Sequence, residues 1–252
     1  FGVPGESYLE VLDGFYDAQS IRFMTCRHEA GAANMAEAYG KMTDNPGVCF
    51  VTRGPGACHA SVGVHIAHQD STPMIMFVGQ VPRPFVGREA FQELELESFF
   101  KPVTKHVEQI TCTKAIPLAV ARAFQMAASA RPGPVVLAFP QDVLDEIVVA
   151  VPEILRSPGQ RGLHASEVEQ IKSLLQQAHQ PVLIVGGASL DASAIEHIER
   201  FADQNKIPVC VSFRRLDCFD NTHPSYAGYL GLSAHDDVWS FVNQSDLSLI
   251  HI

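Results

Sequence analysis

The chain has 252 residues, of which 46% are hydrophobic and 18% charged, and its formal net charge is −10. An acidic balance without a run of Lys or Arg argues against a nucleic-acid surface or an anionic membrane as partner. No apolar run approaches the roughly 20 residues that span a bilayer. The six cysteines form no C-x-x-C pair, and several lie in apolar runs, which predicts reduced thiols in a cytoplasmic protein.

The first 150 residues alternate helical periodicity with short, continuous apolar runs. The expected helices cover 7–16, 29–40, 54–68 and 116–129, and the expected strands cover 21–25, 48–52, 74–78 and 135–139. Continuous apolar runs are typical of strands that are buried on both faces of a parallel sheet. The repeated strand–helix–strand order therefore predicts an α/β fold in three layers, with helices on both faces of a parallel sheet.

A segment rich in Pro, Gly and charged residues, 151–162, predicts a linker between domains 1–150 and 163–252. In the second domain, Ser166 is expected to cap a helix. The elements expected there are helices 167–178 and 192–205 and strands 182–185 and 209–212. The pattern of the second domain predicts an incomplete Rossmann-like domain with a parallel sheet.

Both ends of the chain have the pattern of a cut sequence. Residues 1–6 resemble the turn after a strand, and residues 247–252 resemble a strand with no loop after it. The last six residues also match the translation of a transposon adapter used in sequencing libraries, which favours an artefactual origin for 248–252. A truncated natural strand is the alternative.

Four features lie where strands of this kind end: Pro4-Gly5, Glu29, Gly54-Pro55-Gly56 and Gly79-Gln80. In parallel α/β sheets, ligands bind beyond the carboxyl ends of the strands, and glycines let a backbone approach a flat ligand closely. By itself, Glu29 is either a first-turn carboxylate that faces the helix dipole or a buried acid with a chemical role. The convergence of the four features favours a pocket at Glu29.

Other clusters carry weaker signals. Gly186-Gly187 follows a strand but lacks G-x-G-x-x-G, so a nucleotide site and a plain turn both remain open. His59, His65 and His68 share a helix without the further ligands that a metal needs, and surface or interface histidines are expected.

An ordered set of motifs carries a family resemblance. The motifs are Phe1-Gly2-Val3-Pro4-Gly5-Glu6, Arg27-His28-Glu29, Gly54-Pro55-Gly56, Gly79-Gln80-Val81, Ala90-Phe91-Gln92-Glu93, Thr104-Lys105-His106 and Arg131-Pro132-Gly133-Pro134-Val135-Val136. Together they resemble the N-terminal half of thiamine-diphosphate enzymes of the acetolactate synthase type (large catalytic subunit). The resemblance is tight over residues 1–146 and looser beyond them.

The resemblance implies that 1–150 is a pyrimidine-binding domain and 163–252 a truncated central domain. It implies that Glu29 hydrogen-bonds N1′ of the cofactor's aminopyrimidine, where a carboxyl group can share a proton with the ring and so activate the cofactor. The residues implied to line the pyrimidine pocket are Pro4, Gly5, Gly54, Pro55 and Gly56, and those implied near the substrate entrance are Phe91 and Gln92.

The same resemblance implies decarboxylation of a 2-oxo acid and transfer of the resulting carbanion to a second carbonyl. The site would lie between subunits of a homodimer or tetramer. Mg²⁺ and the diphosphate would be held by a Gly-Asp-Gly…Asn-Asn motif of a C-terminal domain; this motif does not occur in the 252 residues, so the fragment alone is expected to be inactive. The alternatives are a simple decarboxylase of the benzoylformate type and a non-catalytic subunit that keeps the fold for nucleotide binding or interaction.

The sequence also departs from the synthases. Cys58-His59 stands where they usually have Thr-Asn. Arg131 matches a position that contacts FAD in the synthases, and Gly186 and Gly187 are candidate nucleotide contacts. The glycine- and methionine-rich segments of FAD-binding synthases are, however, replaced here by 213–217 and 229–232. FAD and the identity of the 2-oxo acid therefore both stay open.

Overall fold

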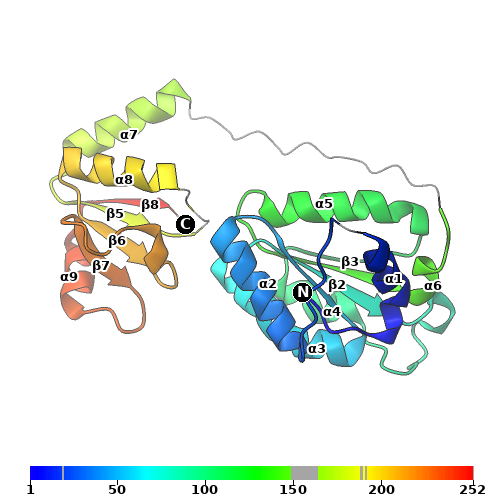
Figure 1. Cartoon of the computed structure of the whole chain (residues 1–252). Helices are drawn as coiled ribbons and strands as arrows, with labels where there is room; N and C mark the ends of the chain where they lie inside the picture. The colour runs from blue at the N-terminus through cyan, green and yellow to red at the C-terminus, as the bar shows by residue number, and fades with distance from the viewer. Residues whose placement is uncertain (19, 149–163, 188–189, 191, 252) are drawn as a thin grey trace. The chain divides into compact units, whose positions relative to one another are not determined.

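A computed structural model of the chain describes residues 1–18, 20–148, 164–187, 190 and 192–251 (Figure 1). The chain divides into two compact units, residues 1–158 and 159–252. The linker expected over 151–162 lies outside the described residues. Within the described ranges, no helix has both the length and the apolar character that crossing a bilayer requires.

The first unit is built on a four-stranded parallel sheet with strand order β1-β2-β4-β3. Its strands are β1 (Gly47–Val51), β2 (Met74–Gln80), β3 (His106–Gln109) and β4 (Pro134–Pro140). Every residue of β2 and β4 is buried, because helices cover both faces of these central strands. The expected parallel α/β architecture is confirmed.

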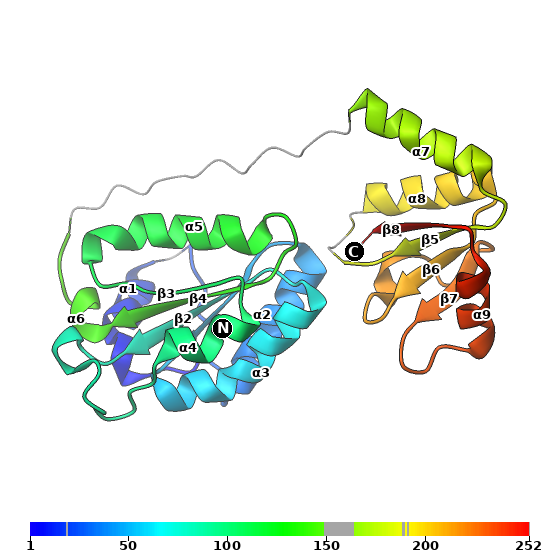
Figure 2. The same ribbon diagram turned by 180° about the vertical axis from the view of Figure 1, so that it is seen from behind.

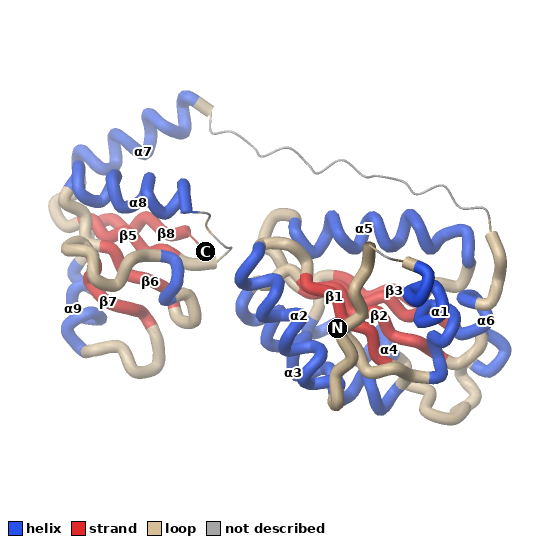
Figure 3. Tube along the Cα trace, viewed as in Figure 1, coloured by secondary structure: helices blue, strands red, loops and turns tan. Residues whose placement is uncertain are grey.

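Alternate strand residues supply the two cores of this unit. Val51, Met76 and Ala138 belong to one core and Phe77 and Leu137 to the other, as the period of two along a strand requires. The helices against the first core are α2 (Glu29–Thr43), α3 (Gly54–Asp70) and α4 (Leu96–Phe100), and the helix against the second is α5 (Ile116–Ala128). Figures 2 and 3 show these layers on the two sides of the sheet.

The strand expected over 21–25 does not form. Gly2 forms isolated parallel bridges with Thr25 and with Phe50. Its N–H donates to the carbonyl of Met24 at 3.0 Å, and its carbonyl accepts the N–H of Cys26 at 2.8 Å. A strand needs a partner backbone, and the short partner here runs into Pro4, which has no N–H to continue the ladder. The preceding helix forms as a 3₁₀ turn (Glu6–Tyr8) followed by α1 (Leu9–Asp17).

The second unit has a separate parallel sheet of strand order β7-β6-β5-β8. Its strands are β5 (Pro181–Val185), β6 (Val209–Ser212), β7 (Tyr226–Leu230) and β8 (Leu247–His251), and its helices are α7 (Ala165–Gln177), α8 (Ala192–Asn205) and α9 (Asp236–Gln244). The expected cap at Ser166 is wrong. The helix begins at Ala165, two residues before its expected start, and His164 is the N-cap. The backbone N–H of His164 donates to the Glu167 carboxylate at 2.7 Å, as in a capping box.

Several short elements were not expected from the sequence. They are β3, β7, α4, α9 and α6 (Gln141–Leu144), with 3₁₀ turns at Arg83–Phe85, Lys101–Val103, Thr113–Ala115 and Leu216–Cys218. The segment between β2 and β3 therefore contains helical turns.

Candidate active site

The carboxyl edge of the first sheet brings together the turns that the sequence singled out. A Cβ on Gly79, at the end of β2, would lie 2.1 Å from Oγ of Ser7, and a Cβ on Gly5 would lie 2.6 Å from Cβ of Thr52. The hydroxyls of Ser7 and Thr52 are themselves hydrogen-bonded at 2.9 Å. The 4–5 turn and the ends of β1 and β2 thus pack directly on one another, and this requires glycine at both positions.

Glu29 is the first residue of α2, and its side chain is only 13% exposed. The residue before it, His28, is the N-cap, and its Nδ1 accepts the backbone N–H of Ala30 at 3.1 Å. Gly56 lies in the first turn of α3, where a Cβ would stand 3.6 Å from Oε1 of Glu29. One carboxylate oxygen of Glu29 therefore faces bare backbone, which suits the close approach of a flat ring.

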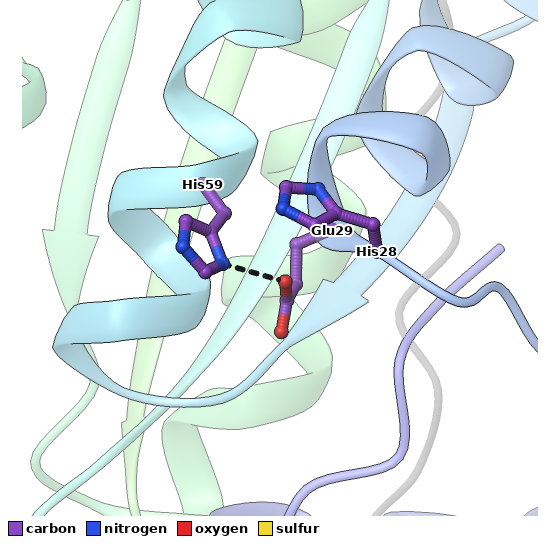
Figure 4. A group of neighbouring side chains, drawn as sticks. All are labelled: His28, Glu29 and His59. Atoms are coloured by element: carbon purple, nitrogen blue, oxygen red, sulfur yellow. Dashed lines mark hydrogen bonds and ion pairs between the residues drawn. The ribbon is translucent and has the colours of Figure 1, made fainter.

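The other oxygen of Glu29 contacts His59, which the sequence predicted to be a surface or interface histidine. Nδ1 of His59, on α3, lies 2.9 Å from Oε2 of Glu29. The His59 side chain is 52% exposed, and its ring stacks on that of His28 with centroids 4.5 Å apart. Figure 4 shows the three side chains: His28, the N-cap of α2, Glu29, the first residue of α2, and His59 from α3. The pairing of His59 with Glu29 was not predicted, because the two residues are 30 positions apart in the sequence. The one sequence signal at this position was that Cys58-His59 replaces the Thr-Asn usual in the synthases.

The same three residues have the composition of a metal site. Their donor atoms lie within 4.8 Å of one another, and two histidines with one carboxylate are a zinc donor set. A metal on Nε2 of neutral His28 would, however, require the ring proton on Nδ1, which accepts the Ala30 N–H. It would also displace the His59–Glu29 bond. The trio therefore satisfies its own hydrogen bonds without a metal.

Arg53, which was not predicted as a site residue, contacts three separate segments of the chain at this edge. Its guanidinium is nearly buried and lies 3.2 Å from Oε1 of Glu6. It donates to the carbonyl of Phe91 at 3.4 Å and to the amide oxygen of Gln141 at 3.3 Å. The linear signal for this role is slight: a single cation between an apolar strand and a glycine turn.

The loop that carries Phe91 and Gln92 lies against the start of α3. The N–H of Gly54 donates to the carbonyl of Gln92 at 2.9 Å, whereas the Phe91 side chain is largely exposed. The Glu93 carboxylate accepts the N–H groups of Gly87 and Ala90, and these hydrogen bonds, led by that from Gly87, hold the pKa of Glu93 below its usual value.

A cavity of about 620 Å³ separates this loop from the ends of β2 and β3. Four glutamates are among its lining residues: Glu89, Glu93, Glu95 and Glu97. Three of them point oxygens at backbone N–H groups of the protein itself: Glu93 as above, Glu95 at Ser98 (2.7 Å) and Glu97 at Gln109 (3.0 Å). Much of the negative charge is therefore used in shaping the loop.

Of the candidate nucleotide residues, Arg131 belongs to the first unit, and Gly186 and Gly187 belong to the second. Arg131 precedes β4, and its Nε donates to Oγ of Ser71, which precedes β2, at 2.7 Å. This is the amino edge of the sheet, opposite Glu29. Gly186-Gly187 ends β5 in the other unit, and the buried Arg215 donates to the carbonyl of Gly187.

Two family profiles match the chain. Residues 1–99 match "Thiamine pyrophosphate enzyme, N-terminal TPP binding domain", and residues 168–250 match "Thiamine pyrophosphate enzyme, central domain". Thiamine pyrophosphate (TPP) is another name for thiamine diphosphate. Both profiles agree with the resemblance drawn from the motifs.

Curated relatives give the same result, and a solved structure shares the fold. The acetolactate synthase large subunit of Corynebacterium glutamicum is 37% identical over 98% of this chain and 40% of its own length. A probable acetolactate synthase large subunit of Methanocaldococcus jannaschii is 36% identical over 92% of this chain and 40% of its own. The fold matches the thiamine diphosphate-dependent 4-hydroxybenzoylformate decarboxylase of Rhodococcus jostii RHA1 with a TM-score of 0.87 and 24% identity, over 99% of this chain and 48% of that one. The chain thus spans about 40% of the length of these curated relatives.

Proposed function

The chain belongs to the thiamine pyrophosphate enzymes, whose N-terminal TPP-binding and central domains it carries, and we propose that it is part of an acetolactate synthase-like carboligase. The reaction is decarboxylation of a 2-oxo acid and transfer of the resulting carbanion to a second carbonyl. One observation carries this proposal: a nearly buried carboxylate, Glu29, presents one oxygen to the bare backbone of Gly56 at the carboxyl edge of a parallel sheet.

In this proposal Glu29 is the catalytic residue, and its Oε1 meets N1′ of the aminopyrimidine. A carboxyl group in a site sheltered from water can share a proton with a ring nitrogen. When bound, the cofactor supplies the nucleophilic carbon that attacks the 2-oxo acid. Around Glu29, the residues proposed to line the pocket are Pro4, Gly5, Gly54, Pro55 and Gly56.

The remaining parts of the site are proposed as follows. Phe91 and Gln92 lie at the entrance for the small 2-oxo acid, because their loop is fastened both to Arg53 and to the first turn of α3. The diphosphate and Mg²⁺ bind parts of the full-length protein outside these 252 residues, and the site is completed in a homo-oligomer, at least a dimer. A cytoplasmic location is part of the proposal, because six cysteines without a C-x-x-C pair are expected to be reduced thiols.

The test is turnover of pyruvate by the full-length protein with thiamine diphosphate and Mg²⁺. Glu29→Gln should lower kcat by about 10²–10⁴, the range of a proton-transfer group. Asp236→Asn is the matched control, since it makes the same amide change in the first turn of α9 and should leave turnover unchanged. Undiminished turnover in Glu29→Gln refutes the role of Glu29. Release of a free aldehyde in place of a carboligated acid would identify a simple decarboxylase.

A further inference from the structure

We propose that His59 is a positioning residue that holds one oxygen of Glu29 and so turns the other toward the cofactor. The inference rests on the proposed function of Glu29. His59 Nδ1 contacts Oε2 at 2.9 Å, and Oε1 is the oxygen that faces Gly56. The two oxygens of one carboxylate thus have separate tasks.

Glu29 needs such a partner because of its place in the helix. A carboxylate in a first turn is free to swing toward the unpaired N–H groups of that turn and away from any ligand. Holding one oxygen from a neighbouring helix removes this freedom, and orientation of this kind is what makes a catalytic group effective.

In this proposal His59 is the hydrogen-bond donor and Glu29 the acceptor. A carboxylate oxygen that carries no proton can only accept, so the proposal places the ring hydrogen of His59 on Nδ1, facing Oε2 of Glu29. The His59 ring is oriented in turn by stacking on His28, and the His28 ring is fixed by the backbone N–H of Ala30. The α2 backbone therefore orients His28, His28 orients His59, and His59 orients the Glu29 carboxylate (Figure 4).

The packing of α2 on α3 sets the distance that the pair must bridge. A Cβ on Gly63 would lie 2.6 Å from Cβ of Ala33 and 2.8 Å from its carbonyl carbon. The helices therefore touch backbone to backbone one turn beyond His59. This contact brings residues 29 and 59 within reach of each other, although they are 30 positions apart in the sequence.

The test compares the binding of two ligands by calorimetry in the full-length protein with Mg²⁺: thiamine diphosphate, and its analogue in which a C–H replaces N1′. The wild type should prefer the natural cofactor by about tenfold to a hundredfold, the value of a hydrogen bond to a charged group. His59→Leu should lose most of this preference while binding the analogue as the wild type does. His59→Asn keeps a donor at the place of Nδ1 and should retain the preference, and His65→Leu, an exposed histidine on the same helix, should leave it unchanged.

Three other results would contradict the positioning role of His59, its role as a donor, or the role of Glu29. A wild-type preference in His59→Leu, or equal weakening of both ligands, shows that His59 does not position Glu29. Loss of the preference in His59→Asn as complete as in His59→Leu refutes the donor role. If Glu29→Gln itself keeps the wild-type preference, the proposed function fails, and this result is read independently of every His59 variant.

Discussion

The two parallel sheets of this chain use their carboxyl edges differently. In the first unit a buried arginine, Arg53, lies behind the glycine turn and fastens the loops around it. In the second unit a buried arginine, Arg215, contacts the glycine turn itself, donating to the carbonyl of Gly187 and pairing with Asp217 at 3.2 Å. The arginine therefore fastens neighbouring segments in the first unit, whereas in the second unit it contacts the glycine turn directly.

The comparison teaches that a strand-end glycine turn is not evidence of a site until its surroundings are known. The Glu29 carboxylate has one oxygen bonded to His59 and the other beside Gly56. At Gly187 the neighbouring cation already has two partners. Variants that disturb each edge should therefore affect different properties.

The largest effect is expected where two backbones touch. Gly63→Val places a branched side chain against the backbone of Ala33 and should lower the free energy of unfolding by about 3 kcal/mol, the upper range for overpacking. Gly231→Val in the second unit meets the rings of Phe213 and Tyr229. Side chains can shift where a backbone cannot, so this variant should cost less than about 1 kcal/mol. Urea unfolding measures the loss of stability in both variants. Equal losses would contradict the expectation that a clash with backbone is more destabilising than a clash with a side chain.

The two buried arginines should separate stability from binding. Arg53→Leu and Arg215→Leu should each lower the free energy of unfolding by about 1–3 kcal/mol, because hydrogen bonds to a charged group are lost. Only Arg53→Leu should also weaken thiamine diphosphate binding, by several-fold, since the loop that carries Phe91 and Gln92 loses its hydrogen bond to Arg53. Calorimetry of the two variants decides this, and weakening of equal size in Arg215→Leu would mean that the second edge also serves the cofactor.

Acid should loosen the loop that presents Phe91 and Gln92. Backbone N–H groups, first that of Gly87, lower the pKa of Glu93 in the folded chain. The stabilisation is therefore fully present above the ordinary pKa of a glutamate and is lost as pH falls through the lower, folded-state value. Glu93→Gln should abolish this pH dependence of amide exchange at Gly87 and Ala90, measured by hydrogen–deuterium exchange between about pH 6 and 3. Glu199→Gln in the second unit is the control, and an unchanged profile in Glu93→Gln would rule the carboxylate out.

The smallest effect is expected at the amino edge of the first sheet. Burial, and then the charge of Arg131, lower the pKa of His68, so the fold favours the neutral ring. Stability from this group is present above the ordinary histidine pKa of about 6.5 and is lost as pH falls below it. His68→Gln should flatten the pH dependence of unfolding between about pH 7 and 5, and His65→Gln should not. Identical profiles for both variants would show that His68 contributes nothing to it.

Local patterns determined most of the architecture. Continuous apolar runs identified β1, β2 and β4, and the periodic, Ala-rich stretch from Glu29 identified α2, because strand burial and helix periodicity are properties of neighbouring residues. The order of elements predicted the parallel sheet, and the rule that ligands bind at its carboxyl edge identified the region of Glu29 and Gly56 before any contact was known.

Only the tertiary structure decided the partners of these residues. The pairing of His59 with Glu29, the three contacts of Arg53 and the placement of Arg131 at the far edge all join residues distant in the sequence. The segment 21–25 has the composition of a strand, but its backbone pairing in the structure is an isolated bridge between Thr25 and Gly2. Propensity and periodicity act within one element, whereas the chemistry of a carboxylate depends on which side chain a second element brings to it, and that is set by packing.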